Sequence, residues 1–309
     1  MKIINDTAGE YADVINSFYE LERFDDNSQT DALFQGYLTS TNKELKEKYK
    51  NYNRRTYLNL EAPCAYCTTD SCNDEQEYFT DVYTLCPYTC DWMNKKSKTK
   101  FIPVPFPYNK KCFEKIDYTA NKVYDVMYMG GLLGTEHYNI INIMKNYKYV
   151  HASISGGHND EFTPTHINIS SEEKWDLLSK SKVSIAMNLA PIYPNHIEYI
   201  QRYDNWQDNE AFKLLETGHI PQFKPRVIES MMCKTLVLVR YDDWNVIEKW
   251  FEPGKHFIYW YSLEDLFYKL YHIVNNYKSY QPIVDAAYDK VQEYEITKIY
   301  EKIKNYETI

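Results

Sequence analysis

The sequence predicts an α/β protein with two domains, each built on a doubly wound, mostly parallel sheet. Short apolar segments alternate with amphipathic helical stretches through the second half of the chain, which is typical of such sheets. The apolar run Thr235–Val239 is almost uninterrupted, as expected for a strand that helices cover on both faces. The 309 residues are many for one hydrophobic core and indicate about two domains.

Composition and charge restrict the classes of partner. Hydrophobic residues form 44% of the chain and charged residues 26%, which is enough to bury a sizeable core. The net charge of −9 argues against a nucleic-acid partner, because binding phosphates needs a basic face. No apolar run approaches the ~20 residues that span a bilayer, and Met1–Asp6 lacks the apolar start of a signal peptide. We therefore expect a cytoplasmic protein whose seven cysteines are reduced.

Short strands joined by irregular connections are expected in the first half. The predicted elements are strands at Lys2–Asn5, Ala32–Gln35, Arg55–Leu60, Val82–Leu85 and Phe101–Val104, and a helix at Thr41–Tyr52. Pro103, Pro105 and Pro107 alternate along the last of these segments. Because proline has no amide hydrogen for a central ladder, we expect this segment to leave the sheet as an extended linker.

Strands and helices alternate more regularly in the second half. The predicted strands are Asp125–Met129, Val183–Met187, Thr235–Val239 and His256–Trp260. Ser170 and Glu173 form a capping-box pattern that predicts the start of a helix, and Ser262 with Asp265 forms a similar one. The last stretch, Ile283–Tyr306, is predicted as one long charged amphipathic helix. In such a fold, ligands bind at the carboxyl ends of the strands.

A glycine-rich turn, Gly130-Gly131-Leu132-Leu133-Gly134, follows the strand at Asp125–Met129 and precedes a helix. Glycines allow backbone amides to approach an anion, and the following helix N-terminus favours negative charge. The turn does not match a dinucleotide fingerprint, because Met129 stands where the first glycine should be. The sequence thus excludes a nicotinamide enzyme and leaves two alternatives, an anion site or a tight turn without a ligand.

A second candidate site opens the helix before the strand Thr235–Val239. Lys224, Arg226 and Glu229 lie in its first turns, and the last two project from one side because they are three residues apart. A cation near a diphosphate and a carboxylate near ribose hydroxyls would form a nucleotide clamp. An isolated Arg-x-x-Glu is more often a surface ion pair, so the interpretation depends on its context.

The residues around Arg226 and Glu229 resemble a known sequence pattern. The run from Pro221 to Leu266 contains Arg-x-x-Glu, an apolar strand, Phe251-Glu252-Pro253-Gly254 and Ser262-Leu263-Glu264-Asp265-Leu266. It resembles the C-terminal domain of GT-B glycosyltransferases, closest to the glycosyl transferases group 1-like and spore-maturation-like families. The resemblance implies two Rossmann-like domains with a cleft between them. It implies an acceptor domain at 1–115, a nucleotide-sugar donor domain at 116–285, and a helix at 286–309 that packs back across both.

The same resemblance implies that Gly130, Gly131, Lys224, Arg226 and Glu229 bind the donor, with Arg226 at the diphosphate and Glu229 at the ribose. The sequence departs from the family at two places. Pro221 stands eight residues before Glu229, so the Glu-x7-Glu signature of retaining enzymes is absent. Cys233 and Lys234 stand where relatives carry a small residue and a glycine.

The N-terminal half resembles fucosyltransferase-like GT-B enzymes more faintly, through Leu58-Asn59-Leu60-Glu61-Ala62-Pro63. This resemblance implies that Glu61 is the catalytic base, which takes a proton from the acceptor hydroxyl. The alternative is a strand-end acid bonded to nearby backbone amides.

Metal sites are not expected. Cys64, Cys67 and Cys72 have a spacing that zinc can use, but loop or buried thiols are the favoured alternative. The chain has no Asp-x-Asp, so cationic side chains and the helix dipole must offset the donor's phosphate charge. We expect no cofactor, no metal and no transmembrane segment.

The sequence therefore predicts a glycosyltransferase that moves a sugar from a nucleotide-sugar to a hydroxyl of a glycan or glycoconjugate, by an inverting, metal-independent reaction. Two alternatives stay open: a catalytically inactive nucleotide-sugar-binding or scaffold protein of the same fold, and a retaining GT-B transferase. The donor base, the sugar, the acceptor and the oligomeric state are not predicted.

Overall fold

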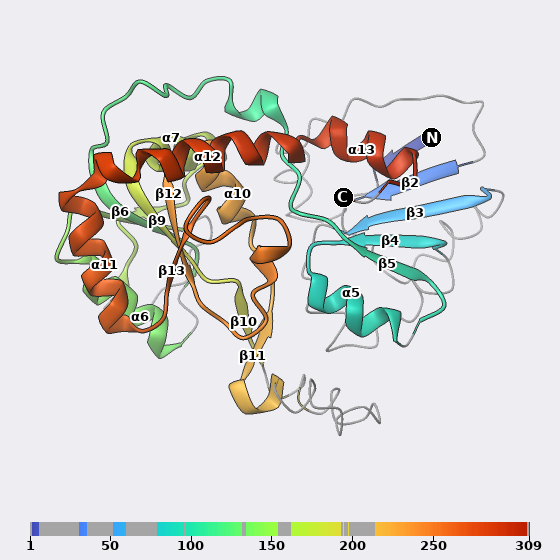
Figure 1. The fold of residues 1–309 in the computed structure, drawn as a ribbon, viewed down its shortest axis with the longest axis horizontal. Helices are drawn as coiled ribbons and strands as arrows, with labels where there is room; N and C mark the ends of the chain where they lie inside the picture. The colour runs from blue at the N-terminus through green and yellow to red at the C-terminus, as the bar shows by residue number, and fades with distance from the viewer. Residues whose placement is uncertain are drawn as a thin grey trace. The chain divides into compact units, whose positions relative to one another are not determined.

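A computed structural model describes residues 2–5, 31–35, 52–59, 79–95, 97–131, 134–153, 162–192, 194, 197, 214–307 and 309. The chain forms two compact units (Figure 1). Unit 1 contains Met1–Pro107, Leu189–Phe223 and Thr297–Ile309, and unit 2 contains Tyr108–Asn188 and Lys224–Ile296. The chain thus leaves unit 2 after Asn188 and returns to it at Lys224, which the sequence pattern did not predict.

Unit 1 is built on a five-stranded parallel sheet in the order β1-β2-β3-β4-β5 (Figure 1). The strands are β1 (Lys2–Asn5), β2 (Asp31–Gln35), β3 (Arg54–Asn59), β4 (Asp81–Thr84) and β5 (Lys100–Pro103). All five predicted strands are confirmed with shifts of a single residue at most. Residues 41–51 of the predicted helix at Thr41–Tyr52 lie outside the described residues.

Strand β5 lies at the edge of this sheet, and no strand continues through residues 104–107, where the alternating prolines predicted an extended linker. At an edge, Pro103 removes no hydrogen bond from a second neighbouring strand. The helix α5 (Pro87–Asn94) precedes β5, and its last residue is bonded to that strand. Asn94 accepts from the Phe101 amide through Oδ1 and donates to the Phe101 carbonyl through Nδ2, both at 2.8 Å.

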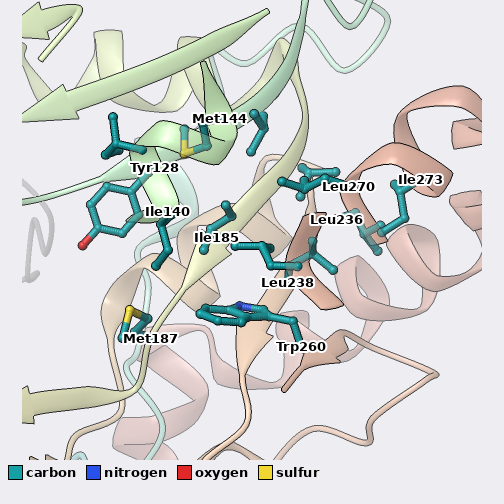
Figure 2. Close-up of a cluster of buried hydrophobic side chains, with 14 of the residues drawn as sticks. Tyr128, Ile140, Met144, Ile185, Met187, Leu236, Leu238, Trp260, Leu270 and Ile273 are labelled. Carbon is teal, nitrogen blue, oxygen red and sulfur yellow. The ribbon is translucent and has the colours of Figure 1, made fainter. Parts of the chain in front are cut away.

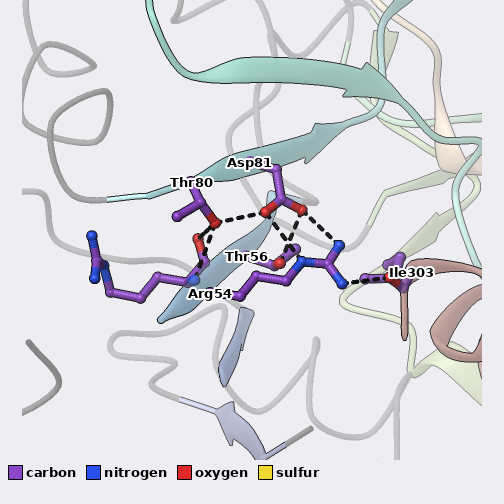
Figure 3. Close-up of polar contacts among 6 residues, drawn as sticks. Arg54, Thr56, Thr80, Asp81 and Ile303 are labelled. Carbon is purple, nitrogen blue, oxygen red and sulfur yellow. Dashed lines mark hydrogen bonds and ion pairs between the residues drawn. The ribbon is translucent and has the colours of Figure 1, made fainter. Parts of the chain in front are cut away.

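A buried ion pair at the start of β3 and β4 binds the end of the chain to unit 1 (Figure 3). Arg54 donates to Asp81 from Nε at 3.3 Å and from Nη2 at 2.9 Å. Its Nη1 donates to the carbonyl of Ile303 at 2.8 Å, in the helix α13 (Ile296–Lys304). The hydroxyls of Thr56 and Thr80 donate to the same Asp81 carboxylate. The network therefore connects two strands of the sheet to the C-terminal segment.

We expect Arg54→Ala to destabilise the protein by about 3–5 kcal/mol, because it leaves the buried Asp81 carboxylate without a counter-charge. Both side chains are well buried, with 5% of Arg54 and 8% of Asp81 exposed. Urea unfolding at pH 7 measures the loss. In the control, Arg54→Met with Asp81→Leu removes both charges together, and we expect most of the stability to return. A cost below 1 kcal/mol for the single variant would mean that this pair does not hold the segment.

Unit 2 contains a six-stranded, wholly parallel sheet in the order β13-β12-β9-β6-β7-β8 (Figure 1). Its strands are β6 (Tyr124–Met129), β7 (Tyr149–Ser153), β8 (His166–Ile167), β9 (Ser181–Ala186), β12 (Leu236–Arg240) and β13 (Ile258–Trp260). Its α-helices are α6 (Thr135–Met144), α7 (Ser171–Ser179), α10 (Pro225–Met232), α11 (Leu263–Asn275) and α12 (Gln281–Val291). The predicted parallel sheet is confirmed in both units.

One hydrophobic cluster of unit 2 lies between this sheet and helices α6 and α11, and it includes Val284 of α12 (Figure 2). Strand side chains such as Ile185 and Leu238 pack with Ile140 of α6 and Leu270 of α11, and all four are fully buried. Helices α7 and α10 contact β9 and each other, and α10 also contacts α12. The near-continuous apolar strands are thus explained, because residues that point to either side of the sheet are buried.

The predicted capping box at the start of α7 is confirmed. The Ser170 hydroxyl accepts from the Glu173 amide at 3.1 Å, and the Glu173 carboxylate accepts from the Ser170 amide at 2.8 Å. The similar pattern before α11 is only half of a box. Ser262 accepts from the Asp265 amide, but the Asp265 carboxylate accepts from the amide of Tyr261 instead.

The prediction of one long helix over Ile283–Tyr306 is wrong. Helix α12 ends at Val291, a 3₁₀ turn covers Gln292–Tyr294, and α13 begins at Ile296. Tyr108 pairs with this break: its amide donates to the Tyr294 carbonyl at 3.2 Å, and its carbonyl accepts from the Ile296 amide at 2.9 Å. The residues on either side of the extended Glu295 therefore bind the backbone of a distant segment, which periodicity alone does not show.

Candidate functional site

The candidate site of unit 2 lies at the carboxyl ends of its strands. Because all six strands are parallel, their carboxyl ends share one edge, where ligands bind in doubly wound sheets. Gly130 follows β6, Asn188 follows β9 and Asp242 follows β12. Helix α10 runs from this edge back along the sheet, because it precedes the parallel strand β12. The edge therefore brings together the glycine turn and the start of α10.

The structure places Arg226 directly over Gly130. Gly130 has a φ of +113°, and a Cβ atom added to it would lie 2.7 Å from Nη2 of Arg226. The backbone angle therefore favours glycine here, and an added Cβ atom would displace the end of the Arg226 side chain. The guanidinium carbon of Arg226 also lies 5.4 Å from the centroid of the Tyr128 ring, within the range of a cation–π contact. Two motifs far apart in the sequence thus form one site.

Arg226 has no anionic partner among the residues that the structure describes. Its half-buried guanidinium makes neither a hydrogen bond nor an ion pair there, and its contacts are with the Tyr128 ring and the Gly130 backbone. A partly desolvated guanidinium without a counter-charge is an attractive partner for phosphate or carboxylate oxygens.

The turn around Gly130 is held by hydrogen bonds and leads into a helix start. The Tyr128 hydroxyl donates to the Gly131 carbonyl at 3.3 Å, and Nε2 of His151 lies 3.2 Å from the Gly130 carbonyl. Helix α6 begins after Gly134, whose position carries no side-chain cap. The first amides of α6 are therefore not used by a capping side chain and carry the positive end of the helix dipole.

A second arginine at the same edge, Arg240, is paired within the protein. Its Nε donates to the Glu136 carboxylate at 2.8 Å, and its Nη1 donates to the carbonyls of Tyr241 and Tyr261. The guanidinium also lies 5.1 Å from the Trp260 ring. Arg240 is thus bound to the first turn of α6 through Glu136. Arg226 differs because it has no carboxylate partner among the described residues.

Glu229 is buried, with 3% of its surface exposed, and its carboxylate lies 2.5 Å from the Lys174 ammonium. Arg226 and Glu229 therefore contact different partners, although both leave the first turns of α10. Lys174 lies on α7 and was not singled out from the sequence. The signal for it was a lysine within the apolar face of that helix, next to Trp175. A role of Glu229 at the ribose stays a prediction.

Lys224 is the N-cap residue of α10, and its amide donates to Oδ1 of Asn188 at 3.0 Å. The other sequence candidates lie elsewhere in the chain. Glu61, Cys64, Cys67 and Cys72 are outside the described residues. Within the described part, no three His, Cys, Asp or Glu side chains gather in a way that could hold a metal ion. The described helices include none long and apolar enough to cross a membrane.

Asp242, which follows β12 at the same edge of the sheet, is a buried carboxylate. Its carboxylate accepts from the amides of Trp244 and Asn245 at 2.9 and 2.8 Å, and only 7% of the residue is exposed. Burial is the main cause that raises the pKa of Asp242 to about 6, while the two backbone hydrogen bonds oppose the shift.

We expect Asp242→Asn to stabilise the protein at pH 7.5, since the folded state holds the carboxylate proton more tightly than the unfolded state does. This raised pKa favours folding below about pH 4, and the benefit is lost as the pH rises to about 6. The amide oxygen can still accept both backbone bonds, so the gain at pH 7.5 should reach about 1–3 kcal/mol and vanish near pH 4. Urea unfolding at both pH values measures it. A loss at pH 7.5 would show that the ionised carboxylate is worth more than its burial costs.

Comparison with known proteins places the chain in a family. A family model described as "Glycosyl transferase-like" matches residues 144–304, which is more than half of the chain. HepE from Anabaena, solved in complex with UDP and glucose, superposes with a TM-score of 0.60 at 7% identity, over 98% of each chain. No curated protein matches the sequence.

Two further solved structures are longer than this chain. TarM superposes with a TM-score of 0.58 at 11% identity, over 90% of this chain and 55% of TarM. The pneumococcal O-GlcNAc transferase GtfA, in complex with UDP and GlcNAc, gives 0.54 at 8% identity, over 91% of this chain and 57% of GtfA. The chain thus spans little more than half of these two proteins.

At such low identities the solved structures show the fold alone, and that fold is GT-B, with two units that each contain a parallel sheet. The family match is independent of them and includes Arg226, Glu229 and the rest of α10. The chain therefore belongs to the glycosyl transferase-like family and is a glycosyltransferase of the GT-B fold.

Proposed function

We propose that this glycosyltransferase uses a nucleoside-diphosphate sugar as donor, and that the donor's diphosphate binds between Arg226 and the Gly130–Gly134 turn. The observation that carries the proposal is the half-buried Arg226, which has no anionic partner among the described residues and lies over a glycine. The HepE and GtfA structures contain UDP, which supports a nucleotide donor for this fold.

The chemistry of such a site is electrostatic. When the sugar leaves the donor, negative charge grows on the diphosphate, and Arg226 with the first amides of α6 would stabilise it. A guanidinium can bind two phosphate oxygens at once, because its N–H groups form a planar fork. Gly130 and Gly131 allow the backbone to approach the same oxygens.

We propose further that transfer is inverting and independent of a metal ion, with Glu61 as the base that activates the acceptor hydroxyl. The absence of Asp-x-Asp from the sequence, and of a glutamate eight residues before Glu229, supports this version of the reaction. The acceptor is proposed to be a hydroxyl of a glycan or glycoconjugate.

Binding and product analysis test the proposal. In calorimetry with UDP, GDP, ADP and dTDP, we expect at least one nucleotide to bind, with the same affinity after treatment with EDTA. With the matching nucleotide sugar and a panel of glycan acceptors, NMR of the first product should show the anomeric configuration opposite to that of the donor. Failure of all four nucleotides to bind contradicts the donor proposal. Restoration of transfer by Mg²⁺ or Mn²⁺ after EDTA contradicts metal independence, and retained configuration contradicts the inverting reaction.

A further inference from the structure

Asn188 lies just beyond the carboxyl end of β9, between the strand ends that carry Gly130 and Asp242. Its side chain is fully buried, and its Oδ1 accepts the amide hydrogen of Lys224 at 3.0 Å. The bond joins the point where the chain leaves unit 2 to the point where it returns. Lys224 is the N-cap residue of α10, and Arg226 follows in the first turn. Asn188 therefore holds the backbone from which Arg226 projects.

The nitrogen atom of the Asn188 side-chain amide is in an unusual environment. The Nδ2 atom of Asn188 is buried and has no hydrogen-bond partner among the described residues. A buried N–H group without a partner destabilises a folded protein, although a buried carboxylate in its place would carry a desolvation cost. Aspartate would accept the same bond from Lys224 without the unused N–H group. Its negative charge would also be favourable at the start of α10.

The nearby arginine explains why a neutral acceptor is better. A carboxylate at position 188 would add a negative charge at the Lys224 amide, two residues before Arg226 and at the same edge of the sheet. Arg226 would then have an internal counter-charge, as Arg240 has in Glu136. An asparagine oxygen holds the same backbone amide but adds no negative charge, so the attraction of Arg226 for an external anion is kept.

We propose that Asn188 is a positioning residue of the donor site. Through its bond to Lys224 it keeps Arg226 over Gly130, and through its lack of charge it keeps Arg226 available for the diphosphate. This inference rests on the proposed function, because it assumes that an anionic donor binds at Arg226.

Two substitutions separate the two parts of this role, the hydrogen bond and the absence of charge. Asn188→Asp keeps the acceptor for Lys224 and adds a charge, and burial of that charge should lower the unfolding temperature. Its affinity for the nucleoside diphosphate that binds the unmodified protein should also fall about tenfold or more, because Arg226 then has an internal counter-charge. Asn188→Ala removes the acceptor and adds no charge, and its affinity should fall by about three- to tenfold.

Hydrogen exchange gives a readout that does not depend on the ligand. The Lys224 amide should be protected in the unmodified protein and in Asn188→Asp, and it should exchange faster in Asn188→Ala. A double-mutant cycle then tests whether Asn188 acts through Arg226. Adding either substitution at 188 to Arg226→Ala should cause no further loss of affinity.

The outcomes that overturn the inference are distinct from a failure of the proposed function. Unchanged nucleotide affinity in both variants, or losses that add fully to that of Arg226→Ala, would show that Asn188 does not act through Arg226. An unprotected Lys224 amide in the unmodified protein would show the same, even if both variants failed to fold. Absence of nucleotide binding to the unmodified protein would instead reject the donor proposal itself.

Discussion

Replacing Glu61 with glutamine is expected to lower the rate of sugar transfer by about 10²–10⁴-fold and to leave the affinity for the nucleotide donor unchanged. Glutamine keeps the size and hydrogen-bonding reach of glutamate, but it cannot accept a proton from the acceptor hydroxyl. The loss should therefore fall on the chemical step, which single-turnover kinetics measures separately from binding. Calorimetry with the donor nucleotide provides the matching measurement of affinity.

The controls for this prediction are the next acidic residues in the sequence. Asp70, Asp74 and Glu75 follow Glu61 closely and, like it, lie outside the described residues. Their amide variants should transfer sugar at near-normal rates. Normal turnover in Glu61→Gln, together with an inactive variant at one of the other three positions, would move the base to that position. Normal turnover in all four would exclude this segment as the source of the base.

The second large effect is expected at Arg226. We expect Arg226→Ala to weaken nucleoside-diphosphate binding by about 10–100-fold, which is the loss of hydrogen bonds to a charged group. The guanidinium has no anionic partner among the described residues, so its removal leaves no described carboxylate unpaired. The stability of the protein should change little. Calorimetry and thermal unfolding of the same samples measure both quantities.

Three further variants make the Arg226 prediction specific. Arg226→Lys keeps the charge but loses the planar fork and the contact with the Tyr128 ring, so an intermediate affinity is expected. Arg240→Ala removes an arginine that is already paired with Glu136, and the affinity should fall less. Gly130→Ala introduces a Cβ atom into the space of the Arg226 guanidinium and should weaken binding without any change of charge. Normal affinity in both Arg226→Ala and Gly130→Ala would place the diphosphate elsewhere.

The elements that were predicted correctly are stabilised by interactions between residues that are close together in the sequence. The five strands of unit 1 and strands β6, β9, β12 and β13 of unit 2 follow from apolar runs, whereas β7 and β8 were not predicted. The start of α7 follows from the reciprocal bonds of Ser170 and Glu173. The end of β5 at Pro103 follows from the alternating prolines, because proline lacks an amide hydrogen in any context. In each case the decisive interaction lies within one strand, one turn or one residue, so the sequence pattern is sufficient.

One departure from the family pattern also has a local explanation that needs the structure. The resemblance led us to expect glycine at position 234, and the φ of Lys234, +51°, lies in the left-handed region that glycine favours. Its ammonium lies 4.5 Å from the centroid of the Tyr288 ring. This cation–π contact helps to offset the cost of the backbone conformation. The position thus keeps the backbone shape expected of glycine with a different residue.

By itself, the sequence predicted the five strands of unit 1, strands β6, β9, β12 and β13 of unit 2, the capping box of α7, and candidate donor motifs at Gly130 and Arg226. Only the tertiary structure decided that Gly130 and Arg226 lie in contact, that Glu229 is paired with Lys174, and that Tyr108 divides the C-terminal helix. The physical reason is the range of the interactions. Periodicity, caps and prolines act over a few residues and leave a pattern in the sequence. A guanidinium over a glycine or a buried ion pair joins distant segments, and it forms only once packing has brought their elements together.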